Sequence, residues 1–264
     1  MKGFVVGSYY PVDSFVHQLD PRAKLGFVFV MMIYVFFADA VLPSAIFFLF
    51  TLAAIRTAKI PFKLFFSALK PVLWIMLISA FLHIWMTKGG QPVLSISFVT
   101  IYEEGIRQAG IIATRLYLFV SIASLLTFTT SPMDLTDGIE KILSPFKKVG
   151  VPAHELALMM SIALRFIPTL WEETEKIRKA QMARGVDFEE GHLLKRMKQY
   201  LPILIPLFVS SFRRAEELAL AMEARCYQGA EGRTKWRQLH FTLKDLWLVA
   251  ILILLGGVLW IFHQ

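Results

Sequence analysis

The sequence predicts an all-α integral membrane protein, with about five transmembrane helices and a cytoplasmic module of long amphipathic helices inserted before the last of them. The first observation is the composition: 56% of the 264 residues are apolar and 23 are Phe, whereas average soluble domains are about 45–50% apolar. The second is a series of nearly uncharged stretches long enough to cross a bilayer. The third is the uneven distribution of Lys and Arg between the two sides of these stretches.

The uncharged stretches predict the spans in chain order. Between Lys24 and Arg56 the sequence contains one charge, Asp39. A single helix over that stretch would measure about 46 Å, against a hydrocarbon core of about 30 Å, so we expect two short helices that turn near Asp39 and Pro43. Further spans are predicted at 71–87, 108–133 and 246–262. The predicted domains are a four-span membrane domain (1–130), the cytoplasmic module (131–243) and the last span (244–264).

The basic residues predict the orientation. Three precede the first span, four lie between the second and third, and eighteen lie between Lys141 and Lys244, whereas only two lie between the third and fourth. Because Lys and Arg accumulate on the cytoplasmic side, we expect a cytoplasmic N-terminus, a cytoplasmic module and an external C-terminus. Topology then accounts for the net charge of +8, and a nucleic-acid partner is not expected.

Two apolar patches in the module, 155–167 and 201–212, are too short to span a bilayer and predict buried or interfacial helices. In each patch, apolar and small residues recur at spacings of three and four, which places them on one helix face. Pro168 is expected to bend or interrupt the first helix. These faces suit either contact with partner proteins or ordinary core filling. The residues that we expect to meet a partner are Met159, Met160, Ala163, Leu204, Phe208, Ser211, Ala215 and Leu218.

A short motif occurs twice in the module, so that Arg184 and Arg225 stand 41 residues apart, each at the end of a helical pattern. The helix dipole alone favours an arginine there by about 0.3–1 kcal/mol, which is the purely structural interpretation. Two such arginines, each after a small alanine, instead indicate two protruding helix ends that offer a guanidinium fork to carboxylates or carbonyls of two equivalent partner subunits. The candidate docking residues are Ala183, Arg184, Gly185, Ala224, Arg225 and Cys226.

With these motifs the chain resembles the transmembrane T component of energy-coupling factor (ECF) transporters. The resemblance covers essentially the whole chain in order. It is carried by Ala183-Arg184-Gly185, Ala224-Arg225-Cys226, the run Leu164-Arg165-Phe166-Ile167-Pro168, the run Leu19-Asp20-Pro21-Arg22-Ala23-Lys24, and Thr129-Thr130-Ser131-Pro132 leading into Leu135 and Gly138.

The resemblance implies a non-catalytic subunit of an ABC-type importer in the plasma membrane of a prokaryote. It implies that two ABC-type ATPase subunits bind the arginine-tipped ends of the coupling helices. The apolar faces of those helices would contact one small membrane-embedded substrate-binding subunit, for uptake of vitamins or other micronutrients. ATP would be bound by the partner subunits, so no cofactor or metal is expected in this chain. Cys226 stands where the family frequently has Gly, which makes a close backbone approach at this position less expected.

The residues themselves agree with a non-catalytic role. The sequence contains no Gly-x-x-x-x-Gly-Lys-Ser/Thr phosphate-binding loop, and its six His are scattered without metal-ligand spacing. Arg115 is the main charge inside a predicted span, and we expect it to snorkel or to form an ion pair. Two alternatives stay open: an autonomous permease, which would need polar residues along a path through the spans, and a membrane scaffold without ATPase partners.

Overall fold

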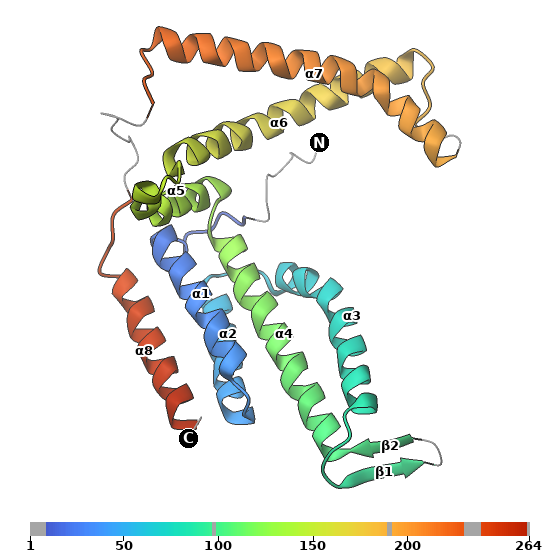
Figure 1. The fold of residues 1–264 in the computed structure, drawn as a ribbon, viewed down its shortest axis with the longest axis vertical. Coiled ribbons are helices and arrows are strands. Elements are labelled where there is room, and N and C mark those ends of the chain that lie inside the picture. Colours follow the sequence, from blue (N-terminus) through green and yellow to red (C-terminus); the bar gives the residue numbers. More distant parts are fainter. Residues whose placement is uncertain (1–8, 97–98, 189–191, 230–238, 263–264) are drawn as a thin grey trace. The chain divides into compact units, whose positions relative to one another are not determined.

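The computed structural model describes residues 9–96, 99–188, 192–229 and 239–262 (Figure 1). This part of the chain is helical apart from one short β-hairpin and its loops, so the predicted all-α class is confirmed. In chain order the elements are α1 (Pro21–Phe37), α2 (Val41–Thr57), α3 (Phe62–Met86), β1 (Pro92–Ile96), β2 (Val99–Tyr102), α4 (Glu103–Thr129), α5 (Pro132–Leu143), the 3-10 helix η1 (Ser144–Val149), α6 (Ala153–Ala183), α7 (Leu193–Ala224) and α8 (Asp245–Phe262).

The chain forms two compact units, and their boundary falls within α5. One unit contains α1 to α4, the first part of α5, and α8. The other contains the end of α5, η1, α6 and α7. Each unit is described by itself below.

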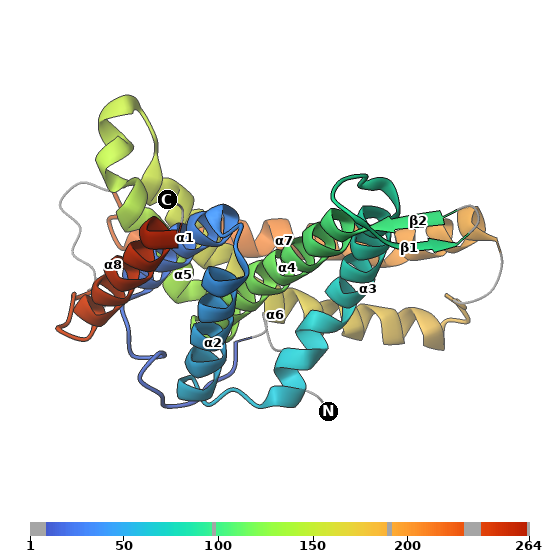
Figure 2. The same ribbon diagram turned by 90° about the horizontal axis from the view of Figure 1, so that it is seen from below.

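In the first unit α4 packs against α1, α2 and α3, while α8 packs against α1 and α2 (Figures 1 and 2). Phe27, Met31 and Val35 of α1 follow a four-residue spacing that turns one face of the helix inward. They meet Phe47 of α2 and Leu118 of α4 in a buried cluster. A second cluster joins α2, α3 and α4. The packing therefore places α4 at the centre of this unit.

The predicted hairpin of two short helices is confirmed. α1 and α2 each have 17 residues, and Asp39 lies in the turn between them. The third predicted span, 71–87, lies almost entirely within α3, but the helix itself begins nine residues earlier, at Phe62, and contains Pro71. A proline inside a helix removes one backbone hydrogen bond and commonly bends the helix, and Figure 1 shows α3 bent in its first part.

Four described helices are long and apolar enough to cross a membrane: α3, α4, α6 and α8. α6 was expected outside the membrane, and its apolar first half meets this criterion of length and composition. Its second half carries a dense run of acidic and basic residues, which is costly to place in hydrocarbon. The cytoplasmic placement of α6 therefore stays a prediction.

No strand was predicted, yet β1 and β2 pair antiparallel between α3 and α4. The segment is rich in Val, Ile and Thr, which favour strands. Gly105, in the first turn of α4, lies close to the end of α3: a Cβ at Gly105 would approach the His83 carbonyl oxygen to 3.1 Å. The hairpin thus closes the connection between two helices that pack tightly side by side.

Charged side chains tie the start of α1 to α4 and α8. The Asp20 carboxylate accepts the Arg22 backbone N–H at 2.8 Å and caps α1, with Pro21 at the first helical position, where proline is favoured. The Asp20 backbone N–H donates to Asp245 Oδ1 at 2.9 Å. The buried Lys24 ammonium donates to the Thr129 carbonyl at 3.0 Å. Since buried polar groups need partners, this network accounts structurally for most of the Leu19–Lys24 run.

Arg115 forms an ion pair, one of the two interpretations that the sequence left open. Its Nη2 lies 2.7 Å from Asp39 Oδ1, and its guanidinium lies 5.2 Å from the centre of the Phe36 ring. These contacts join α4 to the last turn of α1, through Phe36, and to the turn between α1 and α2, through Asp39. The pair therefore fixes the α1–α2 hairpin against the central helix.

The helices α6 and α7 end in the same backbone motif. At the end of α6, Gly185 N–H donates to Met182 and Val186 N–H donates to Gln181; at the end of α7, Cys226 N–H donates to Glu223 and Tyr227 N–H donates to Met222. These are the two bonds of a Schellman motif, which needs a residue in the left-handed conformation. Gly185 supplies it with φ of +88°, and Cys226 supplies it with φ of +57°.

We predict that Cys226→Gly strengthens the last turn of α7. A left-handed conformation costs a residue with a Cβ about 1–2 kcal/mol, and glycine avoids much of that cost. Hydrogen exchange at the Cys226 and Tyr227 amides should slow about fivefold, corresponding to about 1 kcal/mol. Cys226→Ala is the matched control, because it removes the thiol but keeps the Cβ, and it should leave the exchange rate nearly unchanged. Equal slowing in both variants would contradict the conformational explanation.

Candidate functional site: two arginine-tipped helices

α6 and α7 pack against each other in antiparallel directions. Gln181 Nε2, near the end of α6, donates to the Pro202 carbonyl in the first part of α7 at 3.5 Å. Glu173, earlier in α6, contacts Arg214, later in α7, at 2.8 Å. The contact made by the earlier residue of α6 is with the later residue of α7, so the two helices run in opposite directions.

Each helix is continuous through its prolines. Pro168 was expected to bend or interrupt the first helix; it does not interrupt it, because α6 runs from Ala153 to Ala183, and a bend at Pro168 stays a prediction. Likewise α7 contains both Pro202 and Pro206. Each proline costs one backbone hydrogen bond. In a helix of more than 30 residues, the many remaining hydrogen bonds keep the helix intact at the proline.

Glu173 is the main polar junction between the two helices. Its carboxylate accepts a hydrogen bond from the Ser210 hydroxyl through Oε1 and one from Arg214 Nη2 through Oε2. Ser210 and Arg214 are four residues apart and so lie on the same face of α7. Ile203 of α7, whose exposed fraction is 4%, is a buried apolar side chain in the same unit. A half-buried charge pair with both oxygens occupied is stronger than an exposed one.

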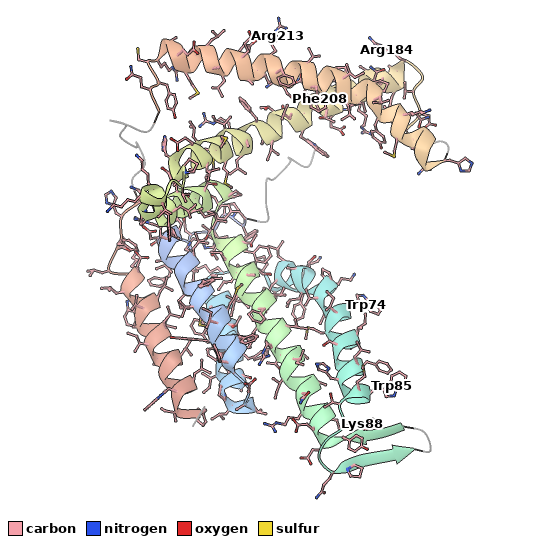
Figure 3. All side chains as sticks on the ribbon, in the orientation of Figure 1. Trp74, Trp85, Lys88, Arg184, Phe208 and Arg213 are labelled. Atoms are coloured by element: carbon pink, nitrogen blue, oxygen red, sulfur yellow. The ribbon has the colours of Figure 1, made fainter. Side chains whose placement is uncertain are left out.

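Arg184 and Arg225 are the C-cap residues of α6 and α7. Both side chains are exposed, and neither makes an ion pair with any residue in the described ranges. Because Gln181 lies beside Pro202, Arg225 stands some 23 residues of α7 beyond the Arg184 end, which is about 35 Å along the helix. Figure 3 shows Arg184 at the tip of α6. The motif therefore places the two guanidinium groups at the two ends of one antiparallel pair.

The other candidate docking residues flank these arginines. Ala183 and Ala224 are the last residues of their helices and are exposed. Gly185 and Cys226 follow the arginines in the left-handed position, and Cys226 is exposed with a free thiol. A Cβ at Gly185 would meet no atom within 4 Å. Both tips are thus uncovered on the surface of this unit.

The residues predicted to meet a partner lie on α6 and α7, but in two separate groups. Met159, Met160 and Ala163 are exposed in the first part of α6. On α7 the side chain of Phe208 is 61% exposed (Figure 3). The remaining members are Leu204 and Ala215, which are exposed, and Ser211 and Leu218, which are half-buried.

The apolar surface of α7 is wider than the sequence pattern indicated. Ile205, Val209 and Phe212 are more than 60% exposed and lie beside Phe208. Ile205, Val209 and Phe212 follow the same spacing of four and three as the predicted stripe, one residue out of phase with it. Reading both phases of the pattern would have identified the whole face.

The described residues contain no group of three His, Cys, Asp or Glu that could hold a metal ion. What the arrangement offers is two cationic tips and an apolar helix face, which are features of protein–protein contact.

Comparison with known proteins identifies the family. The family model described as "CbiQ: Cobalt transport protein" matches residues 13–236. The chain is 50% identical over 259 residues to the "Energy-coupling factor transporter transmembrane protein EcfT" of Bacillus subtilis (strain 168), covering 98% of both chains. Proteins of the same name from Acidaminococcus fermentans (50% identity, 97% of this chain and 96% of the other) and Clostridium kluyveri (49%, 93% and 91%) are similarly related. The resemblance carried by the motifs is therefore confirmed, and the chain belongs to the family of EcfT transmembrane proteins of energy-coupling factor transporters.

Proposed function

We propose that this chain is the coupling subunit that transmits ATP binding and hydrolysis from two ABC-type ATPase subunits to one small membrane-embedded substrate-binding subunit. The cargo would be a vitamin or another micronutrient, chosen by the substrate-binding subunit. The chain itself would be non-catalytic and hold no cofactor, since ATP would be bound by the ATPases. The observation that carries the proposal is the pair of exposed arginines on identically capped helix ends.

Two equivalent tips suit two equivalent partners. Each tip places a guanidinium fork beside a small alanine, which leaves room for a partner's backbone or carboxylate. The exposed apolar face of α7 around Phe208 would contact the substrate-binding subunit. In the proposed orientation the N-terminus and the unit with α6 and α7 are cytoplasmic, the C-terminus is outside, and the membrane is the plasma membrane.

The proposed mechanism is mechanical. Closure of the ATPases on ATP would draw Arg184 and Arg225 toward one another. α6 and α7 would then move as levers about their contact at Glu173, Ser210 and Arg214. That movement would change the grip of the apolar face on the substrate-binding subunit.

An autonomous permease is less well supported. It would need free polar residues along a path through the spans, and the main candidate, Arg115, is engaged by Asp39. A scaffold without ATPase partners would leave the two arginine tips without a role. Affinity purification of the tagged chain followed by mass spectrometry separates these possibilities. We expect two ATPase chains and one small hydrophobic subunit per copy; an active chain purified alone would support the permease.

We predict that Arg184→Ala combined with Arg225→Ala abolishes uptake and removes the ATPases from the purified complex. Truncating one partner of a buried charge pair costs about 2–5 kcal/mol, and each 1.4 kcal/mol is tenfold in affinity. Each single variant should therefore weaken ATPase binding by at least about tenfold and reduce uptake less than the double variant does. The measurements are uptake in cells and the ATPase content of the complex.

The matched control for the arginine variants is Arg213→Ala. Arg213 is an exposed arginine on α7 whose ion pair, to Glu217 at 3.8 Å, lies within the same helix (Figure 3). Arg213→Ala removes the same charge from the side of a helix instead of its end, and this variant should leave ATPase binding near normal. A double variant that keeps both ATPases and transports normally would overturn the docking proposal.

We predict that Glu173→Gln uncouples ATP hydrolysis from uptake, because it weakens the contact about which the levers move while leaving both arginine tips in place. Uptake per ATP hydrolysed should fall severalfold with normal ATPase content. Glu175→Gln is the control, since the ion pair of Glu175 is with Arg178, within α6 itself. The lever mechanism fails if the two variants give the same ratio of uptake to hydrolysis.

A further inference from the structure

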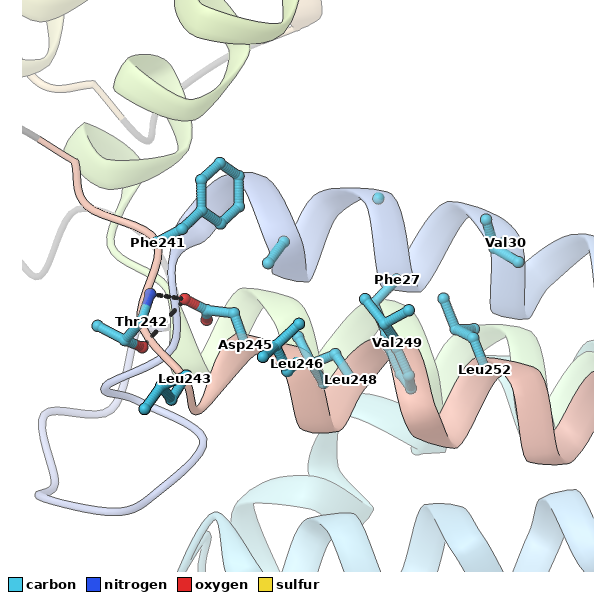
Figure 4. A pocket seen from close by; sticks show the side chains of 12 residues that line it. Phe27, Val30, Phe241, Thr242, Leu243, Asp245, Leu246, Leu248, Val249 and Leu252 are labelled. Carbon is cyan, nitrogen blue, oxygen red and sulfur yellow. Dashed lines mark hydrogen bonds between the residues drawn. The ribbon is translucent and has the colours of Figure 1, made fainter.

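An apolar groove of about 590 Å³ runs between α1 and α8 (Figure 4). Its walls are apolar and small side chains, and Asp245 and Thr242 lie at one end. These two are bonded to each other, since Asp245 Oδ2 accepts the Thr242 backbone N–H at 2.7 Å and its hydroxyl at 3.0 Å. The central lining residues are Ala23, Gly26 and Val30 of α1 with Leu248, Val249 and Leu252 of α8.

The two helices touch at both ends of this groove. At one end Asp20 N–H donates to Asp245 Oδ1 at 2.9 Å. At the other end the Tyr34 side chain reaches across to α8, so that a Cβ at Gly256 would lie 2.7 Å from the Tyr34 hydroxyl. Between these contacts a Cβ at Gly26 would meet nothing within 4 Å. Asp245 and Gly256 are eleven residues apart, or about 16 Å, which is close to half of a hydrocarbon core of about 30 Å.

This shape limits what can fill the groove. A third helix, with a diameter of about 10–12 Å, can lie over the open side but cannot enter the space between helices that are in contact at both ends. Ordered water needs polar partners, and the polar groups at the end of the groove are already bonded to each other. An extended apolar chain, one leaflet deep, satisfies both constraints.

The polar end of the groove has the features of a membrane interface. Lys244 is exposed, and its Nζ bonds the neutral Gln18 amide oxygen at 2.6 Å. Within the described ranges Lys244 makes no ion pair, and it directly precedes Asp245 of the groove lining. Trp247 is 64% exposed in the first turn of α8, at the position typical of interfacial aromatic residues. A phospholipid phosphate is the anion that such an interface supplies.

We propose that the α1–α8 groove binds one acyl chain of a phospholipid, with the lipid phosphate beside Lys244. The assignment of this lipid to the cytoplasmic leaflet rests on the proposed orientation, whereas binding of the acyl chain does not. The site is separate from the arginine tips and from the apolar face of α7.

The test is photo-crosslinking in the purified transporter complex, reconstituted in nanodiscs with a phospholipid that carries a diazirine on one acyl chain. Mass spectrometry should find the cross-links concentrated on Val30, Val249 and Leu252. Gly26→Phe fills the groove and should lower labelling of these residues at least about tenfold, equivalent to 1.4 kcal/mol. Gly110→Phe is the matched control, because Gly110 is also a helical glycine without a neighbour within 4 Å, and labelling should be unchanged.

A second variant keeps the test decisive if Gly26→Phe reduces the yield of folded complex. Lys244→Gln leaves the groove intact and should lower the preference for phosphatidylglycerol over phosphatidylcholine severalfold in the same assay. The proposal is overturned if labelling is as dense on the outward-facing Ile253 and Leu254 as in the groove and is unaffected by Gly26→Phe. Cross-linking in the Arg184/Arg225 double variant distinguishes this site from the coupling function, since the groove should stay occupied without bound ATPases.

Discussion

The antiparallel contact between α6 and α7 is the constraint on which the proposed role of the second unit depends. Glu173 receives both Ser210 and Arg214, and this contact sets how far the end of each helix extends beyond the other. A parallel pair would bring Arg184 and Arg225 to the same end. The antiparallel pair sends them to opposite ends, where two partners can bind without competing for space. The contact of Glu173 with Arg214 thus helps to hold Arg184 and Arg225 at opposite ends of the helix pair.

The equivalence of the two tips resides in the backbone. Gly185 and Cys226 differ in chemistry, yet both occupy the left-handed position that closes a Schellman motif. The hydrogen bonds of this motif hold the preceding arginine, Arg184 or Arg225, as the C-cap residue of its helix. A cysteine there is tolerated at an energetic cost, and the geometry of the arginine is kept.

Much of the architecture follows from the sequence by simple physical reasoning. Helix length against bilayer thickness predicted the α1–α2 hairpin, and the repeated motif identified both arginine tips. The extension of α3 back to Phe62 was not predicted, and for α6 the sequence left a bend and an interruption at Pro168 both open. In both helices a proline penalty of a few kcal/mol is outweighed by neighbouring hydrogen bonds and packing that a local pattern does not contain. The β-hairpin was missed because strand propensity depends on context.

Contacts between residues far apart in the sequence were the other feature that the sequence did not predict. Nothing in the spacing of Glu173 indicates that it meets Arg214 rather than a neighbour on its own helix. The Asp39–Arg115 pair joins residues 76 positions apart, and the sequence offered only the choice between snorkelling and pairing. The exposed face of α7 around Phe212 follows a second phase of the same period, so the pattern was present in the sequence but only one phase of it was used.

The prolines of α7 have a consequence for how the pair is held together. In an uninterrupted α-helix the N–H of residue 206 would donate to the carbonyl of residue 202. Pro206 has no N–H, so the Pro202 oxygen lacks its axial donor and is the acceptor that the Gln181 amide reaches from α6. Pro206 thus removes a hydrogen bond within α7 and leaves its acceptor to a hydrogen bond between α6 and α7. The proline that weakens one helix locally thereby helps to hold the two helices together.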